Sequence, residues 1–258
     1  MKKIIFCSCL LLLFCHGYSQ MLAPMNTSAD KVTFYALGSV SGSNDDVTKT
    51  ITASGRLGVE ISPTEKLNIS IGANLLNANP TSKIKKDSVD FNSLMFPESG
   101  NFGFLFNPSF KLTRKGDYQH TVWLDGTFAF RRVSVDSPDV NFKINTANVG
   151  VKYMWNFNIG DEDNFIFTFM PYWNLFNIPN EDVKRFNAVL NDLLFEKTVK
   201  GAAIHSFGAK TTVQYKTMVF YADLRSNLKT KELNDDNPFK GTKFNIGFST
   251  YLQLKSLN

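Results

Sequence analysis

One predicted hairpin, residues 51–75, limits the fold of this chain more than any other segment. Its first arm, 51–61, and its second arm, 67–75, each alternate apolar and polar side chains without a break. Such a period of two is typical of a β-strand whose two faces meet different surroundings. The connection 62–66 is polar and contains Pro63, which cannot continue a ladder of backbone hydrogen bonds. A strand that crosses a bilayer needs about 9–11 residues, whereas strands of soluble proteins average about 5–6, and these arms have the longer length.

The N-terminal residues 1–19 have the features of a secretory signal peptide. Two lysines precede a short apolar run, and the small-x-small pattern at 17–19 predicts a cleavage site. The run is too short to anchor the chain in a membrane. All three cysteines lie in this segment, so the mature chain is expected to contain neither disulfides nor cysteine metal sites. Alternatively Cys15 is a lipoprotein cysteine, although Phe14 is bulky where that signal has a small residue.

The mature chain, 20–258, is expected to form one domain. Without the two lysines of the leader it has 26 basic and 23 acidic residues. No basic cluster with interleaved aromatics occurs, so no nucleic-acid partner is expected. No segment after the leader approaches the roughly 18 consecutive apolar residues of a membrane helix. Many of the 24 phenylalanines stand at alternate positions, as in strands with one apolar face.

Alternation predicts ten strands in this domain. Their expected ranges are 30–40, 51–61, 67–75, 102–112, 121–131, 147–157, 165–175, 203–215, 218–225 and 243–254. Pro108 predicts a bulge or a local break in the fourth strand. The connections alternate in length, and the long ones are expected at 41–49, 77–99, 134–141, 177–200 and 227–240.

A short amphipathic helix is predicted within the longest connection, at about 180–195. Its apolar side chains recur at intervals of mostly three and four residues, and Asn180 is a suitable N-cap. The candidates for contact through this helix are Phe186, Leu190 and Leu194. Four possibilities are open for it: a plug folded inward, a helix on the outer leaflet, a partner-binding helix, or a helix that only covers its own loop.

An even strand number with alternating short turns and long loops is typical of bacterial outer-membrane barrels. Every backbone amide in hydrocarbon must be paired, so an all-β chain can span a membrane only as a closed barrel. The sequence therefore predicts an all-β, antiparallel transmembrane β-barrel of about ten strands, with a short helix in the longest extracellular loop. Its apolar faces would meet lipid and its charged faces the lumen.

The inward faces carry charges of both signs in mid-strand. The candidate lumen-lining residues are Arg56, Glu60, Asp125, Arg131, Lys152, Lys210, Asp223 and Arg225. One hypothesis is a lining that selects charged solutes. The other is an ion-pair network that packs a narrow lumen, as side chains do in small barrels.

The leader followed by Gln20, the ten strands and the final strand N-I-G-F-S-T-Y-L-Q-L together resemble a small outer-membrane β-barrel protein of the Bacteroidota type. The final strand is similar to the signal that the barrel-insertion machinery recognises, although the chain ends in 255–258 rather than in an aromatic residue. The resemblance implies export to the outer membrane, with outer-membrane lipid and the insertion machinery as partners. It implies no particular activity.

Few side chains suit catalysis or metal binding. His120 and His205 are the histidines after the leader, and they fall at opposite ends of the predicted barrel. Alternation places His205 and Ser206 on opposite faces, which disfavours a Ser-His couple. No cofactor or metal is therefore expected. The favoured function is a non-enzymatic outer-membrane barrel that serves as a narrow channel or as a scaffold for an unknown surface protein partner. Two alternatives stay open: a rim-active enzyme hydrolysing lipid or peptide, and a soluble exported β-barrel that binds a hydrophobic ligand.

Overall fold

The alternating strands close into a barrel in the computed structural model, which describes residues 32–44, 49–77, 102–114, 119–136, 139–159, 163–192, 203–227 and 242–257. Its strands are β1 (Val32–Asn44), β2 (Lys49–Thr64), β3 (Leu67–Asn77), β4 (Phe102–Lys111), β5 (His120–Asp136), β6 (Asp139–Ile159), β7 (Asp163–Asn177), β8 (Ala203–Tyr215), β9 (Met218–Asn227) and β10 (Thr242–Leu257). One helix, α3 (Asn180–Asp192), follows β7. The prediction of ten antiparallel strands with one short helix is confirmed within these residues.

Each strand pairs with its neighbours in the chain, and β1 also pairs with β10. In this closing pair Gly38 stands opposite Thr250 and Val40 opposite Phe248. All ten pairings are antiparallel. Closure gives every strand two partners, so the sheet has no open edge along the shared length of its strands.

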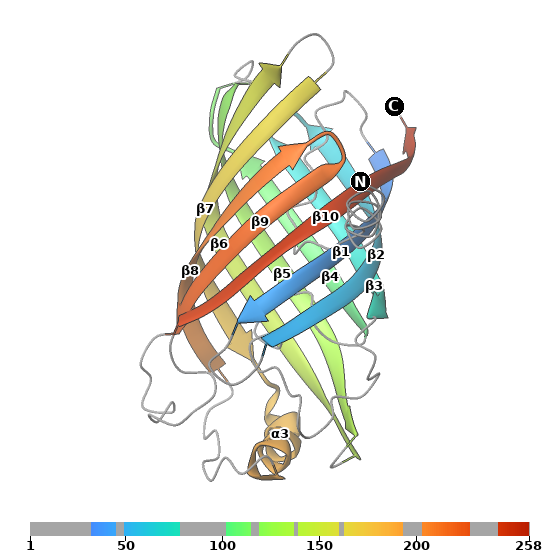
Figure 1. Cartoon of the computed structure of the whole chain (residues 1–258), viewed down its shortest axis with the longest axis vertical. Helices are drawn as coiled ribbons and strands as arrows, with labels where there is room; N and C mark the ends of the chain where they lie inside the picture. The colour runs from blue at the N-terminus through green and yellow to red at the C-terminus, as the bar shows by residue number, and fades with distance from the viewer. Residues whose placement is uncertain are drawn as a thin grey trace, which may run out of the picture.

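The barrel has two unlike ends (Figure 1). At the turn end β2 joins β3 through Glu65-Lys66 and β8 joins β9 through Lys216-Thr217, while β1 begins and β10 finishes there. Lys216 has a φ of 53°, in the left-handed region that a tight turn requires. Helix α3 lies at the opposite end, which we call the loop end.

One predicted connection is wrong. Residues 134–141 were expected to form a loop, but β5 and β6 remain paired to Asp136 and Asp139. Short polar side chains and a proline resemble a loop in sequence, yet a hairpin that projects beyond its neighbours can satisfy its amides by pairing. The predicted loop 41–49 is also shorter than expected, because β1 continues to Asn44 and β2 begins at Lys49. The predicted leader lies outside the described residues.

Pro108 interrupts the sheet on one side, as predicted. Strand β4 pairs with β3 through Pro108 and Ile69, but its register with β5 skips residues 107 and 108. A proline has no amide hydrogen to donate, so one ladder is lost where it stands.

The outward face is apolar and exposed. Its exposed large side chains include Phe34, Leu57, Ile71, Phe104, Phe110, Leu124, Phe130, Phe169, Phe207, Phe220, Leu224, Ile246 and Leu252. Arg114 lies near the turn end and Arg132 lies towards the loop end. In the band of the wall between these two levels, none of the outward side chains that the structure describes carries a charge. The alternation of the sequence thus divides the barrel wall into an uncharged outside and a polar inside.

Candidate functional site in the barrel interior

The inner face gathers the charged side chains of the strands. The eight candidate lumen-lining residues named from the sequence all lie there, and none is more than 8% exposed. Threonine, serine and asparagine side chains from the same face are buried beside them. Strand alternation is the cause, because each apolar outward residue leaves its chain neighbour facing the interior.

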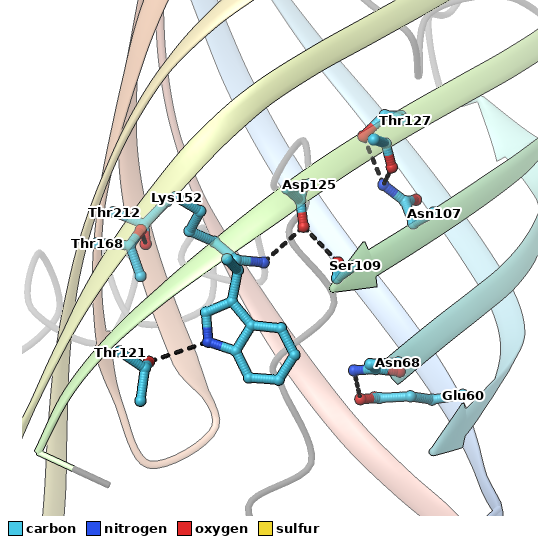
Figure 2. Close-up of polar contacts among 12 residues, drawn as sticks. Glu60, Asn68, Asn107, Ser109, Thr121, Asp125, Thr127, Lys152, Thr168 and Thr212 are labelled. Carbon is cyan, nitrogen blue, oxygen red and sulfur yellow. Dashed lines mark hydrogen bonds and ion pairs between the residues drawn. The ribbon is translucent and has the colours of Figure 1, made fainter. Parts of the chain in front are cut away.

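Asp125 is the centre of one polar cluster (Figure 2). The Nζ of Lys152, on β6, lies 2.7 Å from Asp125 Oδ1 on β5, and both side chains are 2% exposed. Ser109, on β4, donates a hydrogen bond to the same oxygen. Asp125 Oδ2 is buried and has no hydrogen-bond partner among the described residues. The cluster therefore joins three neighbouring strands through one carboxylate.

Tyr172 is the centre of a second cluster. Its hydroxyl, on β7, donates to Asp223 Oδ1 on β9 and accepts a hydrogen bond of 3.1 Å from Arg225 Nε. The Arg225 guanidinium also lies 5.4 Å from the centre of the Tyr172 ring. To reach β9, the tyrosine crosses Gly208, its direct partner on β8. A Cβ on Gly208 would lie 2.4 Å from the tyrosine ring, so this crossing requires glycine.

The same arrangement of tyrosine over glycine occurs elsewhere on the inner wall. Tyr35 on β1 stands opposite Gly58 on β2, and its hydroxyl lies 2.8 Å from Ser70 Oγ on β3. Tyr221 on β9 stands opposite Gly247 on β10, where an added Cβ would lie 2.4 Å from its ring. In each case the ring lies along the wall instead of projecting towards the barrel axis. An aromatic ring over a glycine restores the packing that the missing side chain cannot supply.

Other predicted residues contact side chains on the neighbouring strands. Asn68 donates to Glu60 Oε1, and Arg131 Nη2 donates to Thr146 Oγ1 at 2.9 Å. Figure 2 shows the first of these pairs on the wall beside the Asp125 cluster. Lys210 lies with its Nζ 5.3 Å from the centre of the Tyr221 ring. The interior is thus a set of cross-strand polar contacts, of the kind that stabilises a sheet pair by pair.

The interior changes character towards the loop end, where buried apolar side chains replace the charges. These loop-end residues are Phe142, Ile144, Phe176, Ile178, Phe186 and Ile204, and none is more than 3% exposed. Phe186 comes from α3 and packs edge-on against Phe142 of β6, with ring centres 5.3 Å apart. We call this group the loop-end cap.

Polar contacts hold α3 to the projecting part of β6. Asp182 Oδ2 accepts a 3.0 Å hydrogen bond from the backbone amide of Lys143, and Arg185 bonds the other oxygen of Asp182. The Lys143 ammonium lies 2.8 Å from Glu181 Oε1, and this hydrogen bond and charge raise the pKa of Lys143. Because β7 pairs with β6 only as far as Asn145, α3 covers an edge of β6 that the sheet leaves unpaired.

Two of the candidate helix contacts cannot be placed. The side chain of Leu190 and the whole of Leu194 lie outside the described residues, whereas Phe186 is fully buried. The prediction for those two leucines stays a prediction.

Neither of the two described histidines belongs to the inner clusters. His120 is exposed at the turn end, while His205 faces outward with its ring 5.6 Å from that of Trp173. Ser206, the neighbour of His205, is fully buried on the inner face. Among the described residues no group of three His, Cys, Asp or Glu side chains could hold a metal ion. None of the helices described is both long enough and apolar enough to cross a membrane.

Sequence reasoning missed Ser109 and Tyr172 as members of the clusters. Both occupy inward positions, and the alternation of their strands contains that signal. Which residues they meet depends on the register between strands, and an alternating pattern does not fix the register.

Comparison with known proteins gives matches of shape only. No protein-family model matches the sequence, and no curated protein matches it. Among solved structures, the NanC porin is 12% identical, with a TM-score of 0.31 over 85% of this chain and 100% of that one. OmpT, an outer membrane protein of Vibrio cholerae, is 9% identical, with a TM-score of 0.24 over 90% of this chain and 100% of its own. A loop-deletion mutant of the same protein is 12% identical, with a TM-score of 0.27 over 87% of this chain and 100% of the mutant.

Proposed function

We propose that this chain is a non-enzymatic barrel of the bacterial outer membrane that is closed to free diffusion and presents its loop end as an interaction scaffold. The observation that carries the proposal is the inversion of the wall, with exposed apolar residues outside and buried charges inside. Phe130 is 55% exposed on the outward face of β5, while Arg131 beside it is 3% exposed. Water would disfavour such a surface, and hydrocarbon would stabilise it.

The size of the apolar surface supports a membrane over a soluble exported barrel. Soluble monomers rarely expose a continuous apolar patch larger than about 300–600 Å². Here an exposed phenylalanine, leucine or isoleucine side chain occurs on the outward face of every strand from β1 to β10. The described aromatic pair Trp155 and Phe167, with ring centres 5.4 Å apart near the turn end, suits a membrane interface.

The burial of the inner face supports a closed barrel over an open channel. A water-filled channel would leave its lining accessible, yet Asp125, Lys152 and Arg225 are no more than 2% exposed. Small barrels are generally filled, and wide aqueous channels occur in barrels with more strands. The loop-end cap adds an apolar region between these charges and the loop end of the barrel.

The loop end supports a scaffold role. The projecting β5–β6 hairpin carries α3 along its edge, and Glu181, Lys184 and Arg185 are exposed on that helix. Mixed exposed charges on a helix held in place by a buried phenylalanine could receive a surface protein partner. Delivery through the barrel-insertion machinery, with β10 as the assembly signal, and the Bacteroidota type are part of this proposal and rest on the sequence resemblance.

We also propose that the protein has no enzymatic role. The Ser109, Asp125 and Lys152 cluster contains a hydroxyl, but the three side chains are between 1% and 7% exposed, so a substrate could not reach them. His205 and Ser206 adjoin in sequence but face opposite sides of the wall, so this imidazole and this hydroxyl do not form a Ser-His couple.

A narrow channel is the second candidate, because polar atoms of the interior could bind water. Asn148 Oδ1 and Asn174 Oδ1 are buried without a hydrogen-bond partner among the described residues. Sites of this kind are often filled by ordered water.

Membrane fractionation, heat-dependent gel mobility and planar-bilayer recording together test the proposal. We expect the protein in the outer-membrane fraction, a mobility shift on boiling, and no stepwise conductance. Stepwise conductance would replace the closed scaffold by the narrow channel. Recovery as a soluble periplasmic protein without a mobility shift would overturn both.

A further inference from the structure

Two basic side chains stand side by side on the outward wall where the barrel reaches its loop end. Arg132 on β5 is directly opposite Lys143 on β6. Both side chains face outward and are exposed. Each is the first charged outward residue that its strand reaches beyond the uncharged band of the wall. Residues directly opposite each other in a sheet have Cβ atoms about 4.5–5.5 Å apart, so both side chains can reach one ligand.

This pair of cations has donors that suit an anion. The Lys143 Nζ lies 2.8 Å from Glu181 Oε1 on α3, and these two side chains are 62% and 67% exposed. An ammonium has three donors, so the contact with Glu181 leaves Lys143 able to hold a second acceptor. Arg132 adds a planar guanidinium, whose paired donors match the oxygens of a phosphate. Like charges directly opposite each other destabilise a sheet, and a bridging anion relieves this repulsion.

Exposed phenylalanine side chains lie on the membrane side of the pair. Phe130, two residues before Arg132 on β5, is 55% exposed. Phe104, its direct partner on β4, is 53% exposed. Two residues of a strand span about 7 Å, so these rings lie close to the cations along the wall. Basic side chains next to apolar rings are complementary to a molecule with an anionic head and acyl chains.

Other strands have a different outward surface at this end. On β7, β8 and β9 the described outward residues near the loop end include Leu175, Phe207 and Leu224 and contain neither lysine nor arginine. In the described part of these strands, the cation pair is therefore a feature of the β5–β6 hairpin, which projects furthest at the loop end (Figure 1).

We propose that Arg132 and Lys143 bind the phosphate headgroup of an anionic lipid in the leaflet at the loop end. The acyl chains of this lipid lie along Phe130 and Phe104. The site rests on the membrane location proposed above, because only a barrel whose outward face meets lipid brings acyl chains to these rings.

A tryptophan at position 130 reports which lipid lies beside the pair. The parent protein carries Phe130→Trp, and its native Trp123, Trp155 and Trp173 are changed to phenylalanine. A second protein keeps only Trp173, on the outward face of β7, as a control for position. Both are folded in vesicles of phosphatidylcholine with a minor fraction of phosphatidic acid, and folding is checked by heat-dependent gel mobility. Quenching is compared between vesicles in which either the phosphatidic acid or an equal fraction of the phosphatidylcholine has brominated chains.

We expect phosphatidic acid to be enriched beside the tryptophan at position 130 about fivefold over phosphatidylcholine, which is the effect of one basic residue near an anionic membrane surface. Trp173 in the control protein should show a ratio near one. Arg132→Gln and Lys143→Gln, each added singly to the parent protein, should bring the ratio at position 130 towards one. The matched control Lys184→Gln removes an exposed charge from α3 and not from the wall, so it should leave the ratio unchanged.

Several results would overturn the lipid site. They are equal enrichment of the two lipids at position 130, the same preference at Trp173, or a ratio that neither Arg132→Gln nor Lys143→Gln lowers. Loss of the preference on adding inorganic phosphate would also overturn it, because a free ion would then satisfy the pair. Should either variant fail to fold, the comparison of position 130 with Trp173 decides. Failure of the membrane location gives a different result: neither brominated lipid would quench either tryptophan, and both proposals would fall.

Discussion

The two faces of β5 show how one strand can be adapted to opposite surroundings. Leu124 faces outward and is 46% exposed, whereas Asp125, the next residue, faces inward and is 1% exposed. In a water-soluble barrel the leucine would be buried and the carboxylate exposed. The inversion is repeated around the wall, which indicates that the outward face is solvated by hydrocarbon and that the inward face supplies its own polar partners.

Removing an inward charge should produce the largest effect. Asp125→Ala takes away the carboxylate that Lys152 contacts, and breaking a buried ion pair costs about 3–5 kcal/mol. The free energy of unfolding, measured in urea with the protein folded in phospholipid vesicles, should fall by that amount. The double variant Asp125→Ala, Lys152→Met is the control, and it should recover much of the loss. A loss below about 1 kcal/mol in the single variant would mean that the pair is hydrated, contrary to its burial.

Adding an outward charge should cost slightly less. Ile69 lies on the outward face of β3, opposite Ile61 and Pro108. Ile69→Arg should lower the free energy of unfolding in vesicles by about 2–4 kcal/mol if the residue lies near the bilayer midplane. Glu65→Arg, in the exposed turn, is the control and should change it little. Equal small effects at both positions would place Ile69 outside hydrocarbon.

Glycine positions test the packing of the inner face against that of the outer face. At Gly208 a new methyl would lie 2.4 Å from the Tyr172 ring, whereas at Gly38 the nearest atom would be Thr250 Cγ2 at 3.9 Å. Gly208→Ala should therefore destabilise the barrel by about 1–3 kcal/mol, as overpacking does. Gly38→Ala should have little effect. Thermal unfolding of both variants would check this, and equal effects would argue against the crossing of Tyr172 over Gly208.

A substitution at the loop end should release α3 without unfolding the barrel. Phe186→Ser removes the buried ring that packs on Phe142, so α3 should leave β6 while the barrel keeps its heat-dependent gel mobility. Limited proteolysis should cut the variant near α3 faster than the parent protein. The exposed helix residue Lys184, changed to Ser, is the control. Loss of the mobility shift in Phe186→Ser would show that α3 and the barrel fold as one unit.

The strands and their faces could be predicted from the sequence because both depend on local alternation. The eight inward charges, from Arg56 on β2 to Arg225 on β9, were assigned to the interior in this way. Their partners could not be predicted, because Tyr172 meets Asp223 only through the registers of β7, β8 and β9. Alternation defines a face but not the neighbour across a strand.

The loop end was predicted less completely. The helix α3 could be predicted from the spacing of its apolar residues. Its docking on β6 could not, because it depends on the long β5–β6 hairpin, and the polar residues near Pro138 led to the prediction of a loop there. The contact between Asp182 and the Lys143 amide follows from that extension, since only an unpaired strand edge has an amide to offer.

The most direct test of the inverted wall is quenching of single tryptophans by lipids brominated on their acyl chains. Two proteins folded in vesicles are compared, one keeping only Trp173, on the outward face of β7, and the other keeping only Trp123, on the inward face of β5. Brominated lipid should quench Trp173 strongly and Trp123 weakly. Quenching of Trp123 as strong as that of Trp173, or no quenching of Trp173, would contradict a barrel whose outward face meets lipid.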